Sequence, residues 1–552
     1  MLTDINRRWL EEFHSEYGRA PRMLHIGNIA NNAYNNAKLL NEAGFDCDVV
    51  CYDYYHIMGC PEWEDAEIDG EISDQFRPDW TRVNLNGFVR PKWFAQGWWF
   101  DCINYLIKKR KGMDTYWAWQ GLEMESRTAH PAFWFRLREA FRRFFENAYF
   151  ILARPSSSAF AVLRPGFVRR IGKYPGTAVA VLSMIFIWPV ANIIIRAVRK
   201  CTWNIDGDQS IKRILHLWNK AFPERIDTLS TADLKMHFET MSPWKRLFGH
   251  YDIVLAYSTD PIIPLIAGVP YFAFEHGTIR DIPYKNDAEG RRTAIAYHEA
   301  EHVFVTNFDC LSSAERLAPG KYTLINHPYD EDHGLAVAGH EELRRDLQHQ
   351  LGVDHLFFHP TRQDWVPGTG YADKANDIFL MALGDLKRAG MSVGAVCCEW
   401  GSNVAQSRVL IEHEGLNGCV SWVKPMTNVR FERMAMACDM VVDQFKLGAF
   451  GGVLFKAMAV GSPILTYLNE SRLLEQYAEV PPVVNCRNRE EIVAKVSALL
   501  RNPDKLRKLG EQSRKWIKAH HAKESTVNLQ TAQFRQFLTR QRSDAANSGV
   551  PE

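Results

Sequence analysis

The chain alternates short apolar runs with helical patterns, and this alternation constrains its fold more than any other feature. Met23–Ile26 is an apolar run that ends in Gly27; a helical stretch follows up to Gly44, and Cys47–Tyr52 is the next apolar run. Buried parallel strands read as continuous apolar runs, and a helical crossover usually connects one to the next. The order strand, glycine-containing turn, helix, strand therefore predicts the opening of a parallel α/β sheet.

Further strands of the same kind are predicted in two groups. They are Asp252–Tyr257, Pro270–Phe274 and His302–Thr306, and then His355–His359, Ser392–Cys398, Cys419–Val423, Asp439–Asp443 and Pro463–Tyr467. Helical patterns separate them, such as residues 376–389, whose apolar positions share one face. We therefore predict an α/β protein with two doubly wound parallel-sheet units.

These patterns also place the domain boundaries. We expect a first domain at residues 1–325, with a helical insert at 110–235, and a second domain at 326–505. A charged helical segment at 506–540 and a polar tail at 541–552, predicted to be disordered, complete the chain.

Composition narrows the class of protein. The 552 residues include 66 Lys and Arg against 65 Asp and Glu, a net charge of +1, which argues against a globally basic nucleic-acid binder. None of the eleven cysteines forms a C-x-x-C pair, and the N-terminus carries no apolar signal sequence. We therefore expect a cytoplasmic protein with reduced thiols and no metal site.

The insert contains a stretch unlike the rest of the chain. Residues 133–155 are rich in arginine and aromatic residues, and residues 176–195 carry no charge, with cations on both flanks. Twenty uncharged residues are long enough to span a membrane, but a simple span would put the two parts of the first domain on opposite sides. Pro189 lies within the run. We therefore expect an interfacial or re-entrant hairpin that contacts the inner face of the cell membrane through about 133–200; a buried core helix is the alternative.

A glycine-rich loop in the second unit carries the most specific pattern. The strand that ends at Asp443 is followed by GAFGG and then by a helix. This arrangement points the backbone N–H groups of Gly451, Gly452 and Val453 into the crevice at the strand ends. The N-terminus of a helix favours anions, and glycines allow a ligand to approach closely, so the loop predicts a phosphate site.

Two cations occupy corners of the same predicted sheet. Arg362 follows the strand that ends at His359, and Lys374 precedes the helix at 376–389. Both side chains can face the crevice at the carboxyl ends of the strands, where they would neutralise a diphosphate. The alternative is a pair of solvated surface cations.

These segments resemble the retaining glycosyltransferases of family 4, which have the GT-B fold. GAFGGVLFKAMAVGSP aligns without gaps with the family loop E-G-F-G-x-x-x-x-E-A-M-A-x-G-x-P, and HPTRQDW and DKAND align with its arginine and lysine segments. The resemblance covers roughly 250–530. It implies two Rossmann-like domains facing a cleft, a nucleotide diphosphate sugar gripped by Arg362 and Lys374, a donor loop that includes Phe450, and no cofactor.

The loop departs from the family at both of its glutamates, which fall on Gly448 and Lys456. The second glutamate of the family accepts hydrogen bonds from the ribose, whereas lysine only donates. Three interpretations stay open. Lys456 meets an additional anionic group of an unusual donor, Asp443 or Glu399 takes over the ribose or sugar contact, or the protein has lost activity and kept a binding role.

The first unit is expected to hold the acceptor. In FEHGTIRDIPY, at 274–284, a predicted strand delivers His276 to the crevice, where it can hydrogen-bond the sugar or the acceptor hydroxyl; a structural histidine is the alternative. Gly27 and Asn28 follow the first strand, and their backbone is expected to contact the donor phosphate or the acceptor.

The resulting hypothesis is a glycosyltransferase that moves a sugar, with retention, to a lipid-linked or membrane-bound glycan in cell-surface polysaccharide or glycolipid synthesis. A catalytically inactive GT-B protein that acts as a binding subunit is the main alternative. An NAD-dependent oxidoreductase is disfavoured because G-x-G-x-x-G does not follow the first strand. A hydrolase is disfavoured because the chain lacks G-x-S-x-G.

Overall fold

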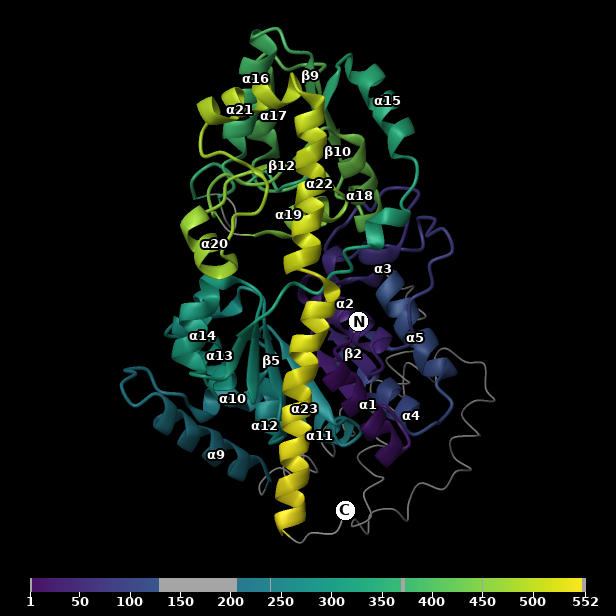
Figure 1. The fold of residues 1–552 in the computed structure, drawn as a ribbon. Coiled ribbons are helices and arrows are strands. Elements are labelled where there is room, and N and C mark those ends of the chain that lie inside the picture. Colours follow the sequence, from purple (N-terminus) through teal and green to yellow (C-terminus); the bar gives the residue numbers. More distant parts are fainter. Residues whose placement is uncertain (1, 129–205, 239, 369–372, 449, 549–552) are drawn as a thin grey trace, which may run out of the picture.

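Two parallel β-sheets, stacked end to end, organise the molecule (Figure 1). The computed structural model describes residues 2–128, 206–238, 240–368, 373–448 and 450–548. The first sheet has the order β3-β2-β1-β4-β5-β6-β7. Its strands are β1 (Arg22–Ile26), β2 (Asp46–Tyr52), β3 (Phe94–Gly97), β4 (Ile253–Tyr257), β5 (Phe272–Glu275), β6 (His302–Val305) and β7 (Tyr322–Leu324).

The second sheet has the order β10-β9-β8-β11-β12-β13, and all its pairings are parallel. Its strands are β8 (His355–His359), β9 (Val393–Cys398), β10 (Val420–Val423), β11 (Met440–Val442), β12 (Ile464–Thr466) and β13 (Val484–Asn485). The prediction of two doubly wound parallel-sheet domains, the α/β fold class called GT-B, is therefore confirmed. The predicted insert at 110–235 lies for the most part outside the described residues.

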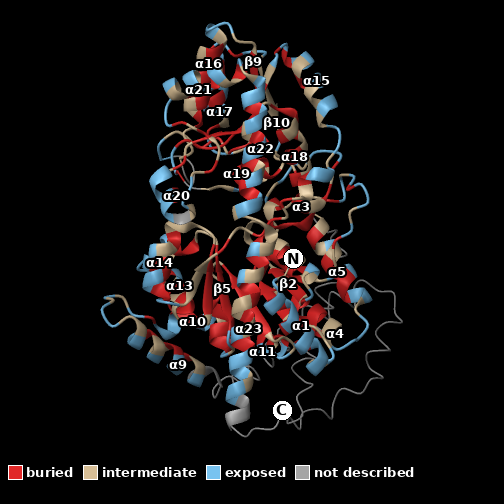
Figure 2. Cartoon of the chain, in the orientation of Figure 1, coloured by how far each residue is buried: buried red, intermediate tan, exposed pale blue. Residues whose placement is uncertain are grey.

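Helices cover both faces of each sheet, so the strands are buried (Figure 2). Around the first sheet lie α1 (Asp4–Tyr17), α2 (Asn32–Glu42), α3 (Pro61–Asp65), α4 (Trp99–Arg110), α5 (Tyr116–Arg127), α9 (Asp206–Ala221), α10 (Thr231–Phe238), α11 (Met241–Phe248), α12 (Ile262–Ala267), α13 (Ala288–His298) and α14 (Leu311–Leu317). Around the second lie α15 (His340–Leu351), α16 (Asn376–Arg388), α17 (Val404–His413), α18 (Asn428–Ala437), α19 (Gly452–Ala459), α20 (Glu470–Tyr477), α21 (Arg489–Leu500) and α22 (Pro503–His520). Each sheet thus separates two hydrophobic clusters.

All ten strands that the sequence predicts are present, within two residues at each end. Three further strands, β3, β7 and β13, were not expected. They are two to four residues long, and β3 contains a glutamine, so none of them forms an apolar run that the sequence pattern could show. Short strands of this kind gain their structure from pairing with a stronger neighbour.

The last helix, α23 (Lys523–Ser548), leaves the second domain and packs along the first (Figure 1). Phe534 packs edge to face on Phe272 of β5, with ring centroids 5.0 Å apart. The sequence predicts disorder from residue 541, but the helix continues to Ser548. Arg542 forms an ion pair of 2.8 Å with Glu16 of α1, which fixes this part of the helix against the first domain.

A small lobe at residues 57–88 extends the first domain toward the second. Its own cluster of buried residues includes Trp63 and Trp80. Arg90, which is buried, binds the carboxylate of Glu62 through two guanidinium nitrogens at 2.7–3.1 Å and thereby anchors α3. The ion pair therefore attaches the lobe to the rest of the first domain.

The membrane segment predicted at about 133–200 lies within residues 129–205, outside the described part of the chain. Among the helices that the structure does describe, none has the length and apolarity that a membrane crossing needs.

Candidate functional site

Each sheet has one position where the chain reverses its direction of winding. In the first sheet this position lies between β1 and β4, and in the second it lies between β8 and β11. The loops that leave the two strands run to opposite sides, which opens a crevice at their carboxyl ends, and ligands of open α/β sheets bind there. We refer to these positions as the N-terminal crevice and the C-terminal crevice.

Arg362 and Lys374 both lie at the C-terminal crevice. The guanidinium of Arg362 lies 3.5 Å from the carboxylate of Asp364, and Lys374 donates a hydrogen bond of 2.9 Å from Nζ to Oε1 of Gln444. The backbone N–H of Lys374 also donates to the carbonyl oxygen of Asp364 at 2.6 Å. The two loops that carry the cations are therefore tied together.

Burial lowers the pKa of Lys374, and Arg362 lowers it further, while Asp443 opposes both. A half-buried arginine and a desolvated lysine beside each other repel, and an anion between them relieves that repulsion. Two carboxylates, Asp443 and Asp364, also face Lys374 and raise its pKa, so the charge of the two cations is partly offset within the crevice.

Asp443, at the end of β11, lies under the glycine-rich loop. Its Oδ1 accepts a hydrogen bond of 3.2 Å from the hydroxyl of Thr361, and among the described residues no donor lies within hydrogen-bond distance of its buried Oδ2. Burial raises the pKa of this carboxyl, and Lys374 counteracts the rise. A Cβ placed on Gly451 would lie 3.4 Å from the Oδ2 atom, so the unpartnered oxygen faces the loop.

Helix α19 begins in this loop, with Gly451 as its N-cap and Gly452 as its first residue. A Cβ built on Gly452 would meet no atom within 4 Å, so the space above the helix N-terminus is open. Phe450 packs face to face on Trp516, with ring centroids 5.8 Å apart, and Val453 packs against the core. The backbone of the loop therefore lies at the crevice, while the side chains of Phe450 and Val453 contact other parts of the domain.

Glu399, at the end of β9, lies beside this crevice in a cavity of about 530 Å³. Its carboxylate forms ion pairs with Lys424 at 2.7 Å and Arg408 at 3.0 Å, and both cations lower its pKa. Trp63 of the first domain and Trp422 of β10 also line the cavity, which both domains therefore form.

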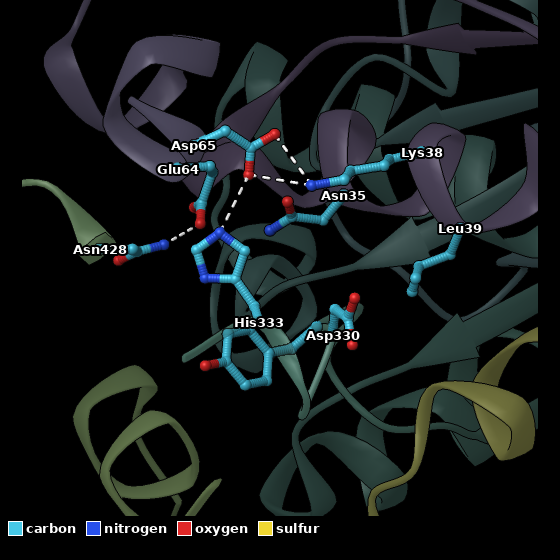
Figure 3. A pocket seen from close by; sticks show the side chains of 9 residues that line it. Asn35, Lys38, Leu39, Glu64, Asp65, Asp330, His333 and Asn428 are labelled. Atoms are coloured by element: carbon cyan, nitrogen blue, oxygen red, sulfur yellow. Dashed lines mark hydrogen bonds and ion pairs between the residues drawn. The ribbon is translucent and has the colours of Figure 1, made fainter. Parts of the chain in front are cut away.

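Lys456 contacts residues of both domains. Its Nζ donates a hydrogen bond of 2.7 Å to Oδ1 of Asn428 and lies 3.7 Å from the carboxylate of Glu64 in the first domain. Asn428 in turn donates a hydrogen bond from Nδ2 to the carboxylate of Glu64, and both residues line a cavity of about 20 Å³ (Figure 3).

Gly448, the other position at which the loop departs from the family pattern, has a φ of +68°, and a Cβ there would lie 2.9 Å from the ring of Tyr467.

The N-terminal crevice is lined by different chemistry. Gly27, with a φ of +85°, follows β1, and a Cβ there would lie 2.1 Å from Oδ2 of Asp260, so only glycine fits. The hydroxyl of Tyr52 donates a hydrogen bond of 2.5 Å to Oδ1 of Asp260, and burial raises the pKa of that carboxyl to about 7. The side-chain NH₂ of Asn28 donates hydrogen bonds to Oδ1 of Asn31 and to the carbonyl oxygen of Gly59. The side chain of Asn28 therefore fixes the loop.

His276 follows β5 and faces the second domain. Its ring lies 5.2 Å from that of His327, which stacks on Phe455 of α19 at 5.4 Å. Burial lowers the pKa of His276 to about 4, so the ring is neutral at pH 7. Beside it, Glu275 is buried with a pKa raised to about 7, and it accepts a hydrogen bond from the backbone N–H of Gly277, which fixes the corner.

The structure thus brings Arg362, Lys374, Asp443 and the backbone of Gly451 together, and it places His276 beside α19. Four further polar residues at the two crevices were not predicted: Tyr52, Asp260, Thr361 and Gln444. A signal was available for all of them, since each ends a predicted strand or follows one within three residues, at the edge where parallel strands bind ligands. In the described residues, no group of three or more histidine, cysteine, aspartate or glutamate side chains could hold a metal ion.

Comparison with known proteins adds little at the level of sequence. No family model matches the chain, and no curated protein matches it. Among solved structures, HepE from Anabaena, in complex with UDP and glucose, is 15% identical over 55% of this chain and 82% of its own, with a TM-score of 0.42. Sucrose-phosphate synthase from Thermosynechococcus elongatus is 15% identical over 56% of this chain and 80% of its own, with a TM-score of 0.40. TarM from S. aureus, in complex with UDP, is 12% identical over 55% of this chain and 58% of its own, with a TM-score of 0.38.

Proposed function

We propose that this protein is a glycosyltransferase that uses a nucleotide diphosphate sugar as its donor. The observation that carries the proposal is the convergence of Arg362, Lys374 and the N-terminus of α19 on the C-terminal crevice. Two cations and a set of unpaired backbone N–H groups form a site for a diphosphate. The same three elements would stabilise the charge that develops on the diphosphate as the bond to the sugar breaks.

The cavity beside β10 supports the same donor. Neighbouring strands lie roughly 4.8 Å apart, so β10, two strands from β8, lies about 10 Å from the diphosphate site. The nucleoside of the donor would extend over that distance into the cavity of about 530 Å³, where Glu399 can accept a hydrogen bond from a hydroxyl. HepE, whose solved structure holds UDP-glucose, binds a molecule of this class.

The acceptor would bind on the side of the first domain. His276, neutral at pH 7, offers one ring nitrogen as an acceptor of a hydroxyl proton and the other as a donor. Asp260 and the backbone of Gly27 lie at the N-terminal crevice of the same domain. Orientation of the two substrates between the domains is then the main work of the protein.

The finer proposal concerns the acceptor and the location. The resemblance of the donor loop to family 4 implies retention, and the arginine-rich and uncharged stretches at about 133–200 favour a lipid-linked or membrane-bound glycan acceptor at the inner face of the membrane. A catalytically inactive binding subunit remains the second candidate, since Gly448 and Lys456 stand where family 4 has glutamates.

A thermal-shift panel of nucleoside diphosphates and their sugars tests the donor site. We expect one nucleotide to raise the Tm of the parent protein, and we expect Arg362→Ala to abolish the shift. Arg507→Ala is a matched control, because Arg507 is an exposed residue of α22 that pairs within its own helix. A panel without any shift in the parent would overturn the proposal. Binding without release of the nucleotide from its sugar, with or without membrane extract as acceptor, would favour the inactive candidate.

A further inference from the structure

Lys456 connects the two domains. It lies in α19, one turn after the glycine-rich loop, and its ammonium group contacts Asn428 of the same domain and Glu64 of the other. The side chains of all three are largely buried; Lys456 is 16% exposed and Glu64 7%. A buried ion pair needs further hydrogen bonds to offset the loss of water, and Asn428 supplies them by binding both charged groups.

Helix α3 holds Glu64 rigidly on the side of the first domain. Glu62 binds the buried Arg90, and Asp65 accepts a hydrogen bond of 2.6 Å from the hydroxyl of Tyr34. Asp65 also accepts a hydrogen bond of 2.9 Å from Lys38 (Figure 3). Two residues of α3, Glu62 and Asp65, thus attach the helix to the first domain. Glu64 is therefore a fixed point of the first domain rather than a flexible surface group.

In the second domain, Lys456 lies close to the proposed phosphate site at the N-terminus of α19. Lys456 is four residues from Gly452, which corresponds to about 6 Å along a helix. Phe455, the preceding residue, stacks on His327, which contacts His276 of the first domain. The N-terminus of α19 is thus positioned by two contacts that lead to the first domain.

We propose that Glu64 is a positioning residue for the donor site: through Asn428 and Lys456 it places the N-terminus of α19 and couples closure of the domains to donor binding. The role of Glu64 at the donor site rests on the proposed function, whereas its role in holding the domains together does not. In this proposal Lys456 does not bind the nucleotide sugar directly, because its ammonium group already has an anionic partner in Glu64. A coupling of this kind between two sites usually changes an affinity between fivefold and about 150-fold.

Exchange of the two charges tests the proposal. Glu64→Lys and Lys456→Glu each place like charges together, whereas the double variant restores an opposite pair. In the double variant, a flip of the Asn428 amide keeps both hydrogen bonds, because the amide oxygen then accepts one from the new lysine and the NH₂ donates one to the new glutamate. The readouts are the radius of gyration from X-ray scattering, which reports opening of the domains, and the affinity for UDP, or for the nucleotide that the thermal-shift panel selects.

We expect both single variants to show a larger radius of gyration and an affinity for the nucleotide lower by about tenfold, and we expect the double variant to recover both. Arg507→Ala is the control, since it removes ion pairs that lie within α22 and do not reach the first domain, and we expect neither quantity to change. Circular dichroism identifies a variant that fails to fold, and Lys456→Met then replaces it as a milder loss of charge.

Single variants that stay closed, or a double variant that recovers neither quantity, would overturn the proposal. Weaker nucleotide binding in Lys456→Glu with unchanged scattering would instead identify Lys456 as a direct donor ligand. A parent that binds no nucleotide would overturn the proposed function and the role of Glu64 at the donor site. The scattering of the variants would still decide whether the contact holds the domains together, so the two failures are distinguishable.

Discussion

The crevice between β8 and β11 and the crevice between β1 and β4 share one backbone design but carry different side chains. The C-terminal crevice has Arg362 and Lys374 beside the start of a helix. At the N-terminal crevice, the hydroxyl of Tyr52 binds the carboxyl of Asp260. The fold thus supplies two equivalent places for a ligand, and we propose from the difference in charge that the diphosphate binds in the second domain.

The acids of the two crevices show the same contrast. Asp443 is buried next to Lys374, whose charge works against the rise of its pKa. Asp260 has only the neutral hydroxyl of Tyr52 among the causes that lower its pKa, and burial raises that pKa to about 7. A group that changes charge near neutral pH suits contact with an uncharged hydroxyl better than contact with a phosphate.

The largest effect is expected from Arg362→Ala. Charge-assisted hydrogen bonds contribute roughly 1.5–3 kcal/mol, so the affinity for the nucleotide should fall by about 10- to 100-fold. Isothermal titration calorimetry at constant salt measures the change, with Arg507→Ala as the control. If Arg362→Ala binds the nucleotide as tightly as the parent, the diphosphate does not lie in the C-terminal crevice.

A smaller effect is expected from Gly452→Ala. The new methyl group meets no protein atom, so the fold is retained, and the helix should be more stable by up to about 1 kcal/mol. The methyl occupies the open space at the N-terminus of α19, and we expect the affinity for the nucleotide to fall by several-fold. Tm and affinity should therefore change in opposite senses.

Gly249→Ala provides the control for this substitution. Gly249 has an ordinary φ of −62° at the end of α11, and a Cβ there would contact only carbonyl oxygens at 3.7 Å or more. It should leave the affinity for the nucleotide unchanged. Equal affinities in Gly452→Ala and the parent would show that the ligand does not approach the helix N-terminus.

The smallest effect on donor binding is expected from Asp260→Asn, which keeps an oxygen for the hydroxyl of Tyr52. The affinity for the nucleotide should stay within about twofold, because our proposal places the diphosphate in the other crevice. Stability should respond instead. Burial raises the pKa of Asp260 in the folded protein to about 7, above its ordinary value of 3.8, so the parent loses stability as pH rises between these values.

Asp260→Asn should lack this loss, so its Tm relative to the parent should rise from pH 5 to pH 8. Calorimetry at several pH values measures the difference. A Tm difference that does not depend on pH would show that the carboxyl does not titrate in this range. A large loss of affinity for the nucleotide in Asp260→Asn would show that the donor binds at the N-terminal crevice, contrary to our proposal.

Sequence patterns were sufficient for the two sheets and for the positions of several candidate site residues in them. Strands such as β8 and β11 are apolar runs, so their ends, and with them Arg362 and Asp443, could be located. The contact of Lys456 with Glu64 could not be predicted, because it joins residues that are far apart in the chain and depends on how the domains meet. The return of α23 to the first domain escaped prediction for the same reason, since a helical pattern does not specify its partner.

A crystal structure of the protein with UDP, or with the nucleotide that the thermal-shift panel selects, tests the central claim most directly. We predict that the diphosphate lies between Arg362, Lys374 and the N–H groups of Gly451 and Gly452, with the nucleoside toward Glu399. A diphosphate bound at Asp260 and Gly27, or no nucleotide in either crevice at saturating concentration, would contradict the account.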